Sequence, residues 1–244
     1  WLENMVDWNL SRSRFWGTPL PIWKTVDDND QYIDEKDGGE VRCIGSIEEL
    51  NDAIRYASEV LSRDVNKHYL HEGILDLHKP YVDDIILVGK SGKRMKRVPD
   101  LIDVWFDSGA MPYAQWGLDH EKLKKGEKYP FKLPPGVNRF EELYPASFIA
   151  EGVDQTRGWF YTLHAIAALL YESVAYKTVV SNGLVLDKNG NKMSKRLGNV
   201  VDPFKTIETY GADATRWYLI TNASPWDNLK FDLEGIREVQ RKFF

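Results

Sequence analysis

Near its middle the chain reads Ala146-Ser147-Phe148-Ile149-Ala150-Glu151-Gly152-Val153-Asp154-Gln155. The first five residues are small or apolar and predict a buried strand, and a mostly apolar stretch over about 156–171 predicts the helix that follows. A second β-rich run covers residues 177–186. The order of strand, loop, helix and strand is that of half a parallel, doubly wound sheet, so the sequence predicts an α/β fold.

Polar side chains come directly after the first of these strands. The carboxylates of Glu151 and Asp154 and the amide of Gln155 suit recognition of ribose hydroxyls and an amine, and Gly152 lets the backbone approach a ligand. The structural alternative is helix capping, with Asp154 as the N-cap and Gln155 in the first turn. The two interpretations are compatible, and both stay open on the local pattern.

A glycine-flanked loop is rich in cations. Between Gly190 and Gly198, the loop 192–196 carries Lys192, Lys195 and Arg196. Such a loop could close over a polyphosphate and neutralise the charge that develops during phosphoryl or nucleotidyl transfer. A solvated surface turn is the alternative when the loop is considered alone.

Two tryptophans lie beside predicted ligand-binding loops. Residues 101–111 predict a short apolar strand that ends in a loop at Asp107-Ser108-Gly109, the place where α/β sheets bind ligands. Trp105 lies in this stretch, and Trp159 follows the Glu151 segment. Because tryptophan presents a large rigid face, the pair could bound a small apolar pocket, although core packing is the default for either.

Composition sets limits on the class of protein. The chain has 32 Lys and Arg against 37 Asp and Glu, a net charge of 32 − 37 = −5, and 43% of its residues are hydrophobic. These values predict an ordinary globular core and argue against a domain coated with nucleic acid. The lysines near 90–97 and 117–140 therefore predict solvated insert surface. The sequence has no long apolar run and no leader, which predicts a cytoplasmic protein without a membrane partner.

Metal and redox chemistry have little support in the sequence. Cys43 is the single cysteine, so an internal disulfide and a multi-thiolate zinc site are excluded, and we expect a free, partly buried thiol. Five histidines lack the spacing of metal ligands: His68, His71, His78, His120 and His164. We therefore expect no bound structural metal.

The remaining segments have recognisable helix signals. Ser46 has capping-box spacing and predicts a helix to about Leu61, residues 81–88 predict a strand, and Asp202-Pro203 and Asp232 predict later helix starts. No internal repeat is expected. The predicted organisation is a Rossmann-like half-domain of residues 1–24, 101–116 and 141–201, a connective insert at 25–100, a second small insert at 117–140, and the start of a helical bundle at 202–244.

Several stretches together resemble the class I aminoacyl-tRNA synthetases. The loop 192–196 is similar to their Lys-Met-Ser-Lys-Ser signature, with Arg196 in the last place, and several members of the isoleucine, valine and leucine group share it. Four further stretches are similar to the isoleucyl branch: 11–19, 103–109, 151–160 and 202–216. A valyl- or leucyl-type fragment and a non-catalytic module that binds tRNA or a partner on the same scaffold remain the alternatives.

The resemblance implies a fold and an activity. The fold is the C-terminal half of a class I Rossmann-like catalytic domain with polar inserts, followed by helices of the junction with the anticodon-binding bundle. Members activate isoleucine with ATP, supplied as its Mg²⁺ complex, and transfer the acyl group to tRNA(Ile). The first-half His-Ile-Gly-His signature and the editing domain of the family have no counterpart here, and both ends of the sequence look cut. We therefore expect a fragment that is inactive without the N-terminal catalytic half and editing domain.

The resemblance also implies roles for individual residues. Those implied to bind the aminoacyl adenylate are Glu151, Gly152, Asp154, Gln155, Trp105 and Trp159. Those implied to bind ATP are Lys195, Met193, Asn182 and Gly183, with Lys192 and Lys195 stabilising the triphosphate in the transition state. Asn182-Gly183-Leu184 stands where many bacterial members have His-Gly-Phe, which affects the contacts expected on the adenine side.

Overall fold

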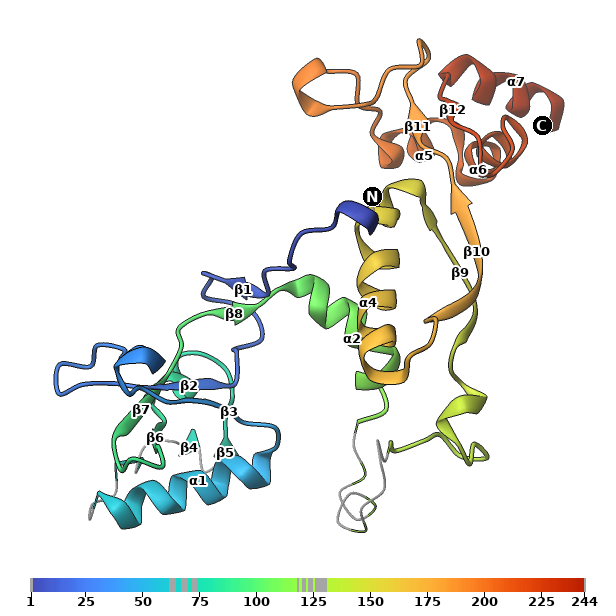
Figure 1. Cartoon of the computed structure of the whole chain (residues 1–244). Coiled ribbons are helices and arrows are strands. Elements are labelled where there is room, and N and C mark those ends of the chain that lie inside the picture. The colour runs from blue at the N-terminus through green and yellow to red at the C-terminus, as the bar shows by residue number, and fades with distance from the viewer. Residues whose placement is uncertain are drawn as a thin grey trace. The chain divides into compact units, whose positions relative to one another are not determined.

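The computed structural model describes residues 2–61, 65–66, 70–71, 74–117, 119, 122, 125 and 131–243. The chain divides into two compact units, Trp1–Asp107 and Ser108–Phe244 (Figure 1). Both units combine helices with small sheets, so the predicted α/β class is confirmed. His68, His120 and much of 117–130, including Lys124 and Lys128, lie outside the described residues.

The first unit is built on a four-stranded antiparallel sheet with one helix along it (Figure 1). In sheet order the strands are β3 (Val41–Cys43), β2 (Ile22–Thr25), β7 (Arg94–Arg97) and β6 (Ile86–Val88). Helix α1 (Ile47–Val60) packs against β6. Trp23, Leu50, Leu87 and Met95 are among the buried side chains between helix and sheet, so apolar burial holds this unit together.

Helix α1 begins where the capping pattern predicts. The Oγ atom of Ser46 accepts a hydrogen bond from the backbone N–H of Glu49 at 3.1 Å. The Glu49 carboxylate in turn accepts from the N–H of Gly45 at 2.9 Å, and this hydrogen bond lowers the pKa of Glu49. The helix start was therefore predictable because its cap is made by residues close together in the chain.

The predicted strand at 81–88 is only half right. Residues Tyr81–Asp84 form a 3₁₀ helix, and the strand β6 begins at Ile86. The turn brings Asp83 to Arg97, a contact between residues distant in the sequence. A local pattern of apolar residues does not reveal such a contact, which is why the prediction failed here.

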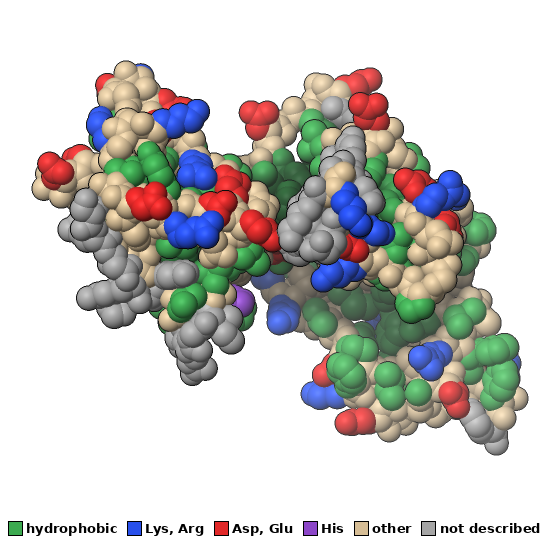
Figure 2. Space-filling view, turned by 90° about the horizontal axis from the view of Figure 1, so that it is seen from below, with side chains coloured by type: hydrophobic (Ala, Val, Ile, Leu, Met, Phe, Trp, Pro, Cys, Tyr) green, Lys and Arg blue, Asp and Glu red, His purple; other side chains and the backbone are tan. Residues whose placement is uncertain are grey.

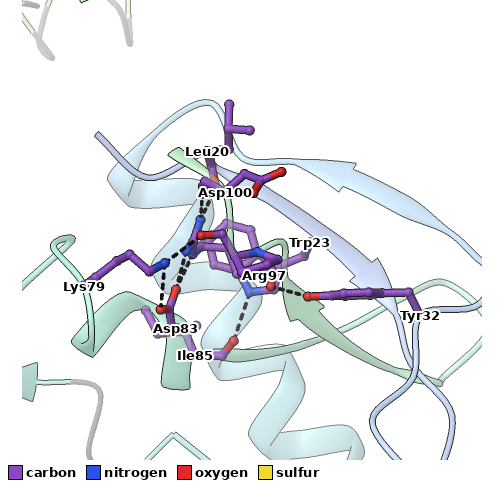
Figure 3. A network of polar contacts seen from close by, with 9 residues as sticks. Leu20, Trp23, Tyr32, Lys79, Asp83, Ile85, Arg97 and Asp100 are labelled. Carbon is purple, nitrogen blue, oxygen red and sulfur yellow. Dashed lines mark hydrogen bonds and ion pairs between the residues drawn. The ribbon is translucent and has the colours of Figure 1, made fainter. Parts of the chain in front are cut away.

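Arg97 has a fully buried side chain that joins both ends of the predicted insert (Figure 3). Its Nε atom donates to the Asp83 carboxylate at 2.8 Å, and Nη2 pairs with the same carboxylate. Its Nη1 atom donates to the carbonyl oxygens of Leu20 at 3.1 Å and Asp100 at 3.0 Å. Tyr32 donates its hydroxyl to the Arg97 carbonyl oxygen at 2.7 Å. The guanidinium therefore fixes the chain near residues 20 and 100, at the two ends of the predicted insert.

The stretch 101–111, predicted as a strand ending in a loop, is mostly a helix. Strand β8 (Leu101–Ile102) is short and pairs with β1 (Ser11–Arg12), and helix α2 (Val104–Ala114) follows at once. The Oδ1 atom of Asp103 accepts from the N–H of Trp105 at 3.2 Å. This side-chain contact at the start of α2 favours helix over strand, so Asp107-Ser108-Gly109 lies within the helix.

The second unit contains the predicted strand, helix and strand order. Strands β9 (Ala146–Gly152) and β10 (Tyr176–Asn182) pair in parallel, with helix α4 (Trp159–Tyr171) between them in sequence and beside them in space (Figure 1). The helix begins three residues later than predicted because a 3₁₀ turn, Val153–Arg157, comes first. The expectation of a buried strand is wrong: Phe148 is 64% exposed, and Val179 and Val180 are exposed on the partner strand.

Two of the remaining helices of the second unit begin at the predicted starts, and the short strand β12 (Leu229–Lys230) interrupts the region predicted to be helical. Besides β12, the remaining elements are β11 (Val185–Leu186), α5 (Pro203–Tyr210), α6 (Ala212–Thr221) and α7 (Leu233–Phe243). The Asp202 carboxylate caps α5 by accepting from the N–H of Phe204 at 2.9 Å, and Asp232 accepts from the N–H of Glu234 at 3.1 Å at the start of α7. Short strands β4 (Leu70–His71) and β5 (Ile74–Leu75) complete the described strands of the first unit.

The surface agrees with the charge balance of the sequence. On the face drawn in Figure 2, acidic and basic side chains are interspersed rather than gathered by sign. Cys43 is free, as expected, but it is exposed rather than partly buried, because it lies on the edge strand β3. Among the described residues, no helix is long and apolar enough to span a bilayer, and no three His, Cys, Asp or Glu side chains cluster in a way that could hold a metal.

Arg97→Met is expected to lower the free energy of unfolding by about 2–4 kcal/mol, because it leaves the Asp83 carboxylate and two carbonyl groups without their buried donor. Arg94→Met is the matched control, since Arg94 pairs with Asp30 in a partly exposed position and its loss should cost below about 1 kcal/mol. Urea denaturation of the two variants measures the difference. Equal destabilisation of both would contradict the role assigned to Arg97.

Candidate functional site

The parallel pairing of β9 and β10 brings four of the predicted site residues together. In the register of the two strands, Glu151 lies opposite Ser181 and Gly152 lies opposite Asn182. Gly183 follows at once in the chain. Both strands therefore end side by side at their carboxyl ends, which is the edge where parallel sheets bind ligands.

The turn after β9 is fixed by Gln155 rather than by Asp154. The Oε1 atom of Gln155 accepts from the N–H of Trp159 at 3.0 Å, at the first residue of α4. Its Nε2 atom donates to the Asp154 carboxylate at 3.2 Å. The predicted N-cap at Asp154 is therefore wrong: α4 begins only at Trp159, and the Gln155 side chain, from the preceding turn, accepts from its first N–H. Glu151 is half-buried and Asp154 is exposed, so the turn presents two carboxylates at the strand end.

The two glycines at these strand ends, Gly152 and Gly183, each leave room for a different neighbouring group. A Cβ atom on Gly152 would lie 2.4 Å from the Asp154 carboxylate, so a side chain there would displace one of the predicted ligand groups. A Cβ atom on Gly183 would lie 2.1 Å from the carbonyl oxygen of Asp227. The N–H of Gly183 also donates to the Pro225 carbonyl oxygen at 2.8 Å. The small size of Gly183 is therefore required by the packing of two chain segments.

A cavity of about 310 Å³ opens beside this crossing point. Its walls include Asn182 and Gly183 at the end of β10 and Val185 at the start of β11. Ile220 and Pro225, from the segment around the end of α6, line it as well. Two of the residues predicted to bind ATP thus line a hollow on the described surface. Ser224 and Asp227 supply polar groups to the same wall.

The two predicted tryptophans belong to different units. Trp159 opens α4 and donates its Nε1–H to the carbonyl oxygen of Ser108 at 3.0 Å, which orients the indole. Trp105 lies in the first turn of α2, within the first unit, and is 42% exposed. A pocket bounded by both tryptophans stays a prediction.

Asp103 is a supporting residue that the sequence analysis missed. Its carboxylate is buried and accepts from Trp8 Nε1 at 2.9 Å and from Arg12 Nη2 at 2.6 Å, while its other oxygen accepts from the Trp105 N–H. It therefore ties the first turn of α2 to the segment that precedes β2. The detectable signal was an aspartate directly before an apolar helix, which is a common N-cap pattern.

His164 belongs to the framework rather than to the site. Its Nδ1 atom accepts from the N–H of Ala175 at 3.1 Å, and its ring stacks on Tyr176 with centroids 4.3 Å apart. Burial lowers the pKa of His164, which favours the neutral ring that this acceptor role needs. The contact joins α4 to the start of β10.

The cationic loop is an ordered turn whose charges face outward. A bridge between Leu186 and Lys192 opens it, and a 3₁₀ turn at Lys195–Leu197 follows. Ser194 caps that turn by accepting from the N–H of Leu197 at 3.2 Å. Lys192, Lys195 and Arg196 are exposed and form no salt bridge within the described part of the chain.

Met193 points away from this cationic surface. It is half-buried and packs against the core formed by α6, α7 and β12, which includes Tyr218 and Ile236. The contact anchors the middle of the loop on the helical part of the second unit. A role for Met193 beside adenine stays a prediction.

Comparison with known proteins identifies extensive similarity. A family model described as tRNA synthetases class I (I, L, M and V) matches residues 1–232. The chain is 62% identical to the isoleucine–tRNA ligase of Cytophaga hutchinsonii, covering 100% of this chain and 19% of that protein. It is 59% identical to the isoleucine–tRNA ligase of Bacteroides fragilis and 44% identical to the one of Deinococcus radiodurans. Each of these matches covers 100% of this chain and 20% of the relative.

A solved structure shares the fold. The LeuRS of Agrobacterium radiobacter K84, in a ternary complex with tRNA and LeuAMS, has a TM-score of 0.58 at 18% identity, covering 96% of this chain and 26% of that one. At this identity the match supports the fold alone. The chain thus spans about a fifth of the length of the curated relatives that it matches.

Gly183→Ala is expected to lower the free energy of unfolding by about 1–3 kcal/mol, because the added methyl group meets backbone rather than a flexible side chain. Gly45→Ala is the control, since its added Cβ would have only an ordinary contact, at 3.7 Å from Glu49. Denaturant unfolding of the two variants checks the difference. If Gly183→Ala were as stable as the control, the close approach to Asp227 would not be a constraint.

Proposed function

Because this chain belongs to the class I tRNA synthetases of the isoleucine, leucine, methionine and valine group, we propose that it is the second half of the catalytic domain of an isoleucine–tRNA ligase. The proposed reaction joins isoleucine to ATP as isoleucyl adenylate, with release of pyrophosphate, and then transfers the acyl group to tRNA(Ile). The observation that carries the proposal is 62% identity to an isoleucine–tRNA ligase over the whole chain.

The exposed faces of the β9–β10 pair support a place in a larger sheet. Parallel sheets are normally covered on both faces, yet Phe148, Val179 and Val180 are 64%, 45% and 41% exposed. The relatives carry about five times as much chain as is present here. We infer that further strands and helices, including the first half of the nucleotide site, cover this pair in the longer protein.

In the proposed reaction, the polar residues near the end of β9 and the two tryptophans bind different parts of the substrates. The isoleucine carboxylate attacks the α-phosphorus of ATP, and the bond to the pyrophosphate leaving group breaks. Glu151, at the end of β9, and Asp154, in the turn that follows, would hold the ribose and the α-amine through hydrogen bonds, and Gln155 would orient Asp154. Trp105 and Trp159 would bound the apolar side chain of the substrate.

The cationic loop would act where negative charge develops. Lys192 and Lys195 are exposed, so their ammonium groups are available to a polyphosphate and can stabilise the charge that accumulates on the leaving pyrophosphate. The Mg²⁺ ion enters with ATP as part of the substrate complex. Asn182 and Gly183 would approach the adenosine from the end of β10, beside the cavity that they line.

The proposed function is tested by isoleucine-dependent exchange of labelled pyrophosphate into ATP. The longer protein that contains this chain is expected to catalyse the exchange with isoleucine, whereas the 244-residue chain alone is expected to give none because half of the nucleotide site is absent. Valine and leucine serve as comparison substrates. Exchange that is fastest with either of them would favour the corresponding synthetase, and tRNA binding without any exchange would favour a non-catalytic module.

Lys195→Ala in the longer protein is expected to reduce kcat for exchange roughly 100-fold, with a smaller effect on KM for ATP, because the contact strengthens in the transition state. Lys188→Ala is the matched control, since Lys188 is an exposed lysine in the hairpin that leads into the same loop. Steady-state exchange kinetics at varied ATP separate the two constants. A rise in KM for ATP with kcat unchanged would assign Lys195 to ground-state binding alone.

A further inference from the structure

The conformation of the cationic loop occurs twice in this chain. Residues 26–38 and 186–198 both form a short hairpin, an extended segment, a 3₁₀ turn and a glycine with positive φ. The two glycines are Gly38 at φ 82° and Gly198 at φ 66°. The two segments share only a few residues, such as Asp27 with Asp187 and Asn29 with Asn189, so the similarity lies in the local structure rather than in a sequence repeat.

Both copies begin with an aspartate that accepts backbone hydrogen bonds across the hairpin. Asp27 Oδ1 accepts from the N–H groups of Asn29 at 2.8 Å and Gln31 at 2.9 Å. Asp187 Oδ1 accepts from those of Asn189 at 2.9 Å and Asn191 at 2.8 Å. The hairpin at residues 26–38 is therefore built in the same way as the hairpin that begins the cationic loop.

The copies differ at the residue after the glycine. In the insert it is Gly39, where a Cβ atom would lie 2.1 Å from the Ile33 carbonyl oxygen. In the cationic loop it is Asn199, whose Oδ1 atom accepts from the N–H of Ser194 at 2.9 Å. Its Nδ2 atom donates to Asp187 Oδ2 at 2.9 Å and to the Lys192 carbonyl oxygen at 3.3 Å. Asn199 thus joins the beginning and the middle of the loop.

These bonds fix the backbone beside both lysines. The carbonyl of Lys192 and the N–H of Ser194 lie on either side of Met193, which is itself packed on the helical core. The hydrogen bond from Asn199 is the main cause that lowers the pKa of Asp187, so the acceptor is held in its ionised form. The lysine side chains remain exposed while the backbone that carries them is held.

We propose that Asn199 and Asp187 are positioning residues for Lys192 and Lys195 in adenylate formation, an inference that rests on the proposed function. A cation that is already oriented stabilises a developing charge without first losing the freedom of its loop. The half-buried pair of Asn199 and Asp187 supplies that order through hydrogen bonds within the loop itself.

The test is Asn199→Gly in the longer protein, which gives the cationic loop the residue that the insert copy has at this position. Pyrophosphate exchange is expected to lose roughly tenfold in kcat, while KM for isoleucine stays near the wild-type value. Asp27→Ala is the matched control, because it removes the corresponding hairpin aspartate of the other copy. This control is expected to leave both constants near wild type.

Asn199→Asp gives a second readout that depends on charge. It keeps an acceptor for the Ser194 N–H but replaces the donor with a carboxylate facing Asp187. The ratio of its kcat to that of the wild type is expected to rise as pH falls, because a proton shared by two neighbouring carboxylates relieves their repulsion. A general loss of structure does not predict this recovery.

The outcomes separate the two proposals. A wild-type protein without isoleucine-dependent exchange would overturn the proposed function. An active wild type whose Asn199→Gly variant retains its kcat would overturn the positioning role alone. Equal changes in kcat and in KM for isoleucine would also overturn it, as would a ratio for Asn199→Asp that does not vary with pH.

Discussion

The parallel pairing of β9 with β10 is the constraint on which the rest of the second unit depends. Its register sets Glu151 and Gly152 beside Ser181 and Asn182, so residues thirty positions apart end at one edge. The chain then passes from that edge into β11 and the cationic loop. A shift of register would separate these ends and would also change the crossing where Gly183 meets Asp227.

Side chains that bind nearby backbone hold the functional segments in shape. Gln155 does so for the turn after β9, Asp103 for the start of α2, and Asp187 with Asn199 for the cationic loop. In each case a short amide or carboxylate satisfies backbone groups that a loop would otherwise leave to water. The groups available for substrate are then the neighbouring exposed side chains, such as Asp154 and Lys195.

Helix-start predictions succeeded where the cap follows a common pattern of residue types, and predictions failed where such a pattern was concealed or the deciding contact was distant in sequence. The caps at Ser46 and Asp202 were predictable because donor and acceptor lie within a few residues. The strand predicted at 81–88 is interrupted because Asp83 turns toward Arg97 across the unit. The cap at Asp103 is local, but the apolar pattern at 101–111 concealed the helix that it begins. The same carboxylate also accepts hydrogen bonds from Trp8 and Arg12, which lie far away in the sequence.

The sequence by itself determined the α/β class, the helix starts and the residues that resemble a synthetase site, because these depend on residue types at short spacing. Only the tertiary structure decided that Gln155 caps α4, that Met193 packs on the helical core, and that Asn199 closes the cationic loop. It also decided that the loop conformation recurs at residues 26–38. The physical reason is that such contacts depend on where the backbone directs each side chain, which residue spacing alone does not specify.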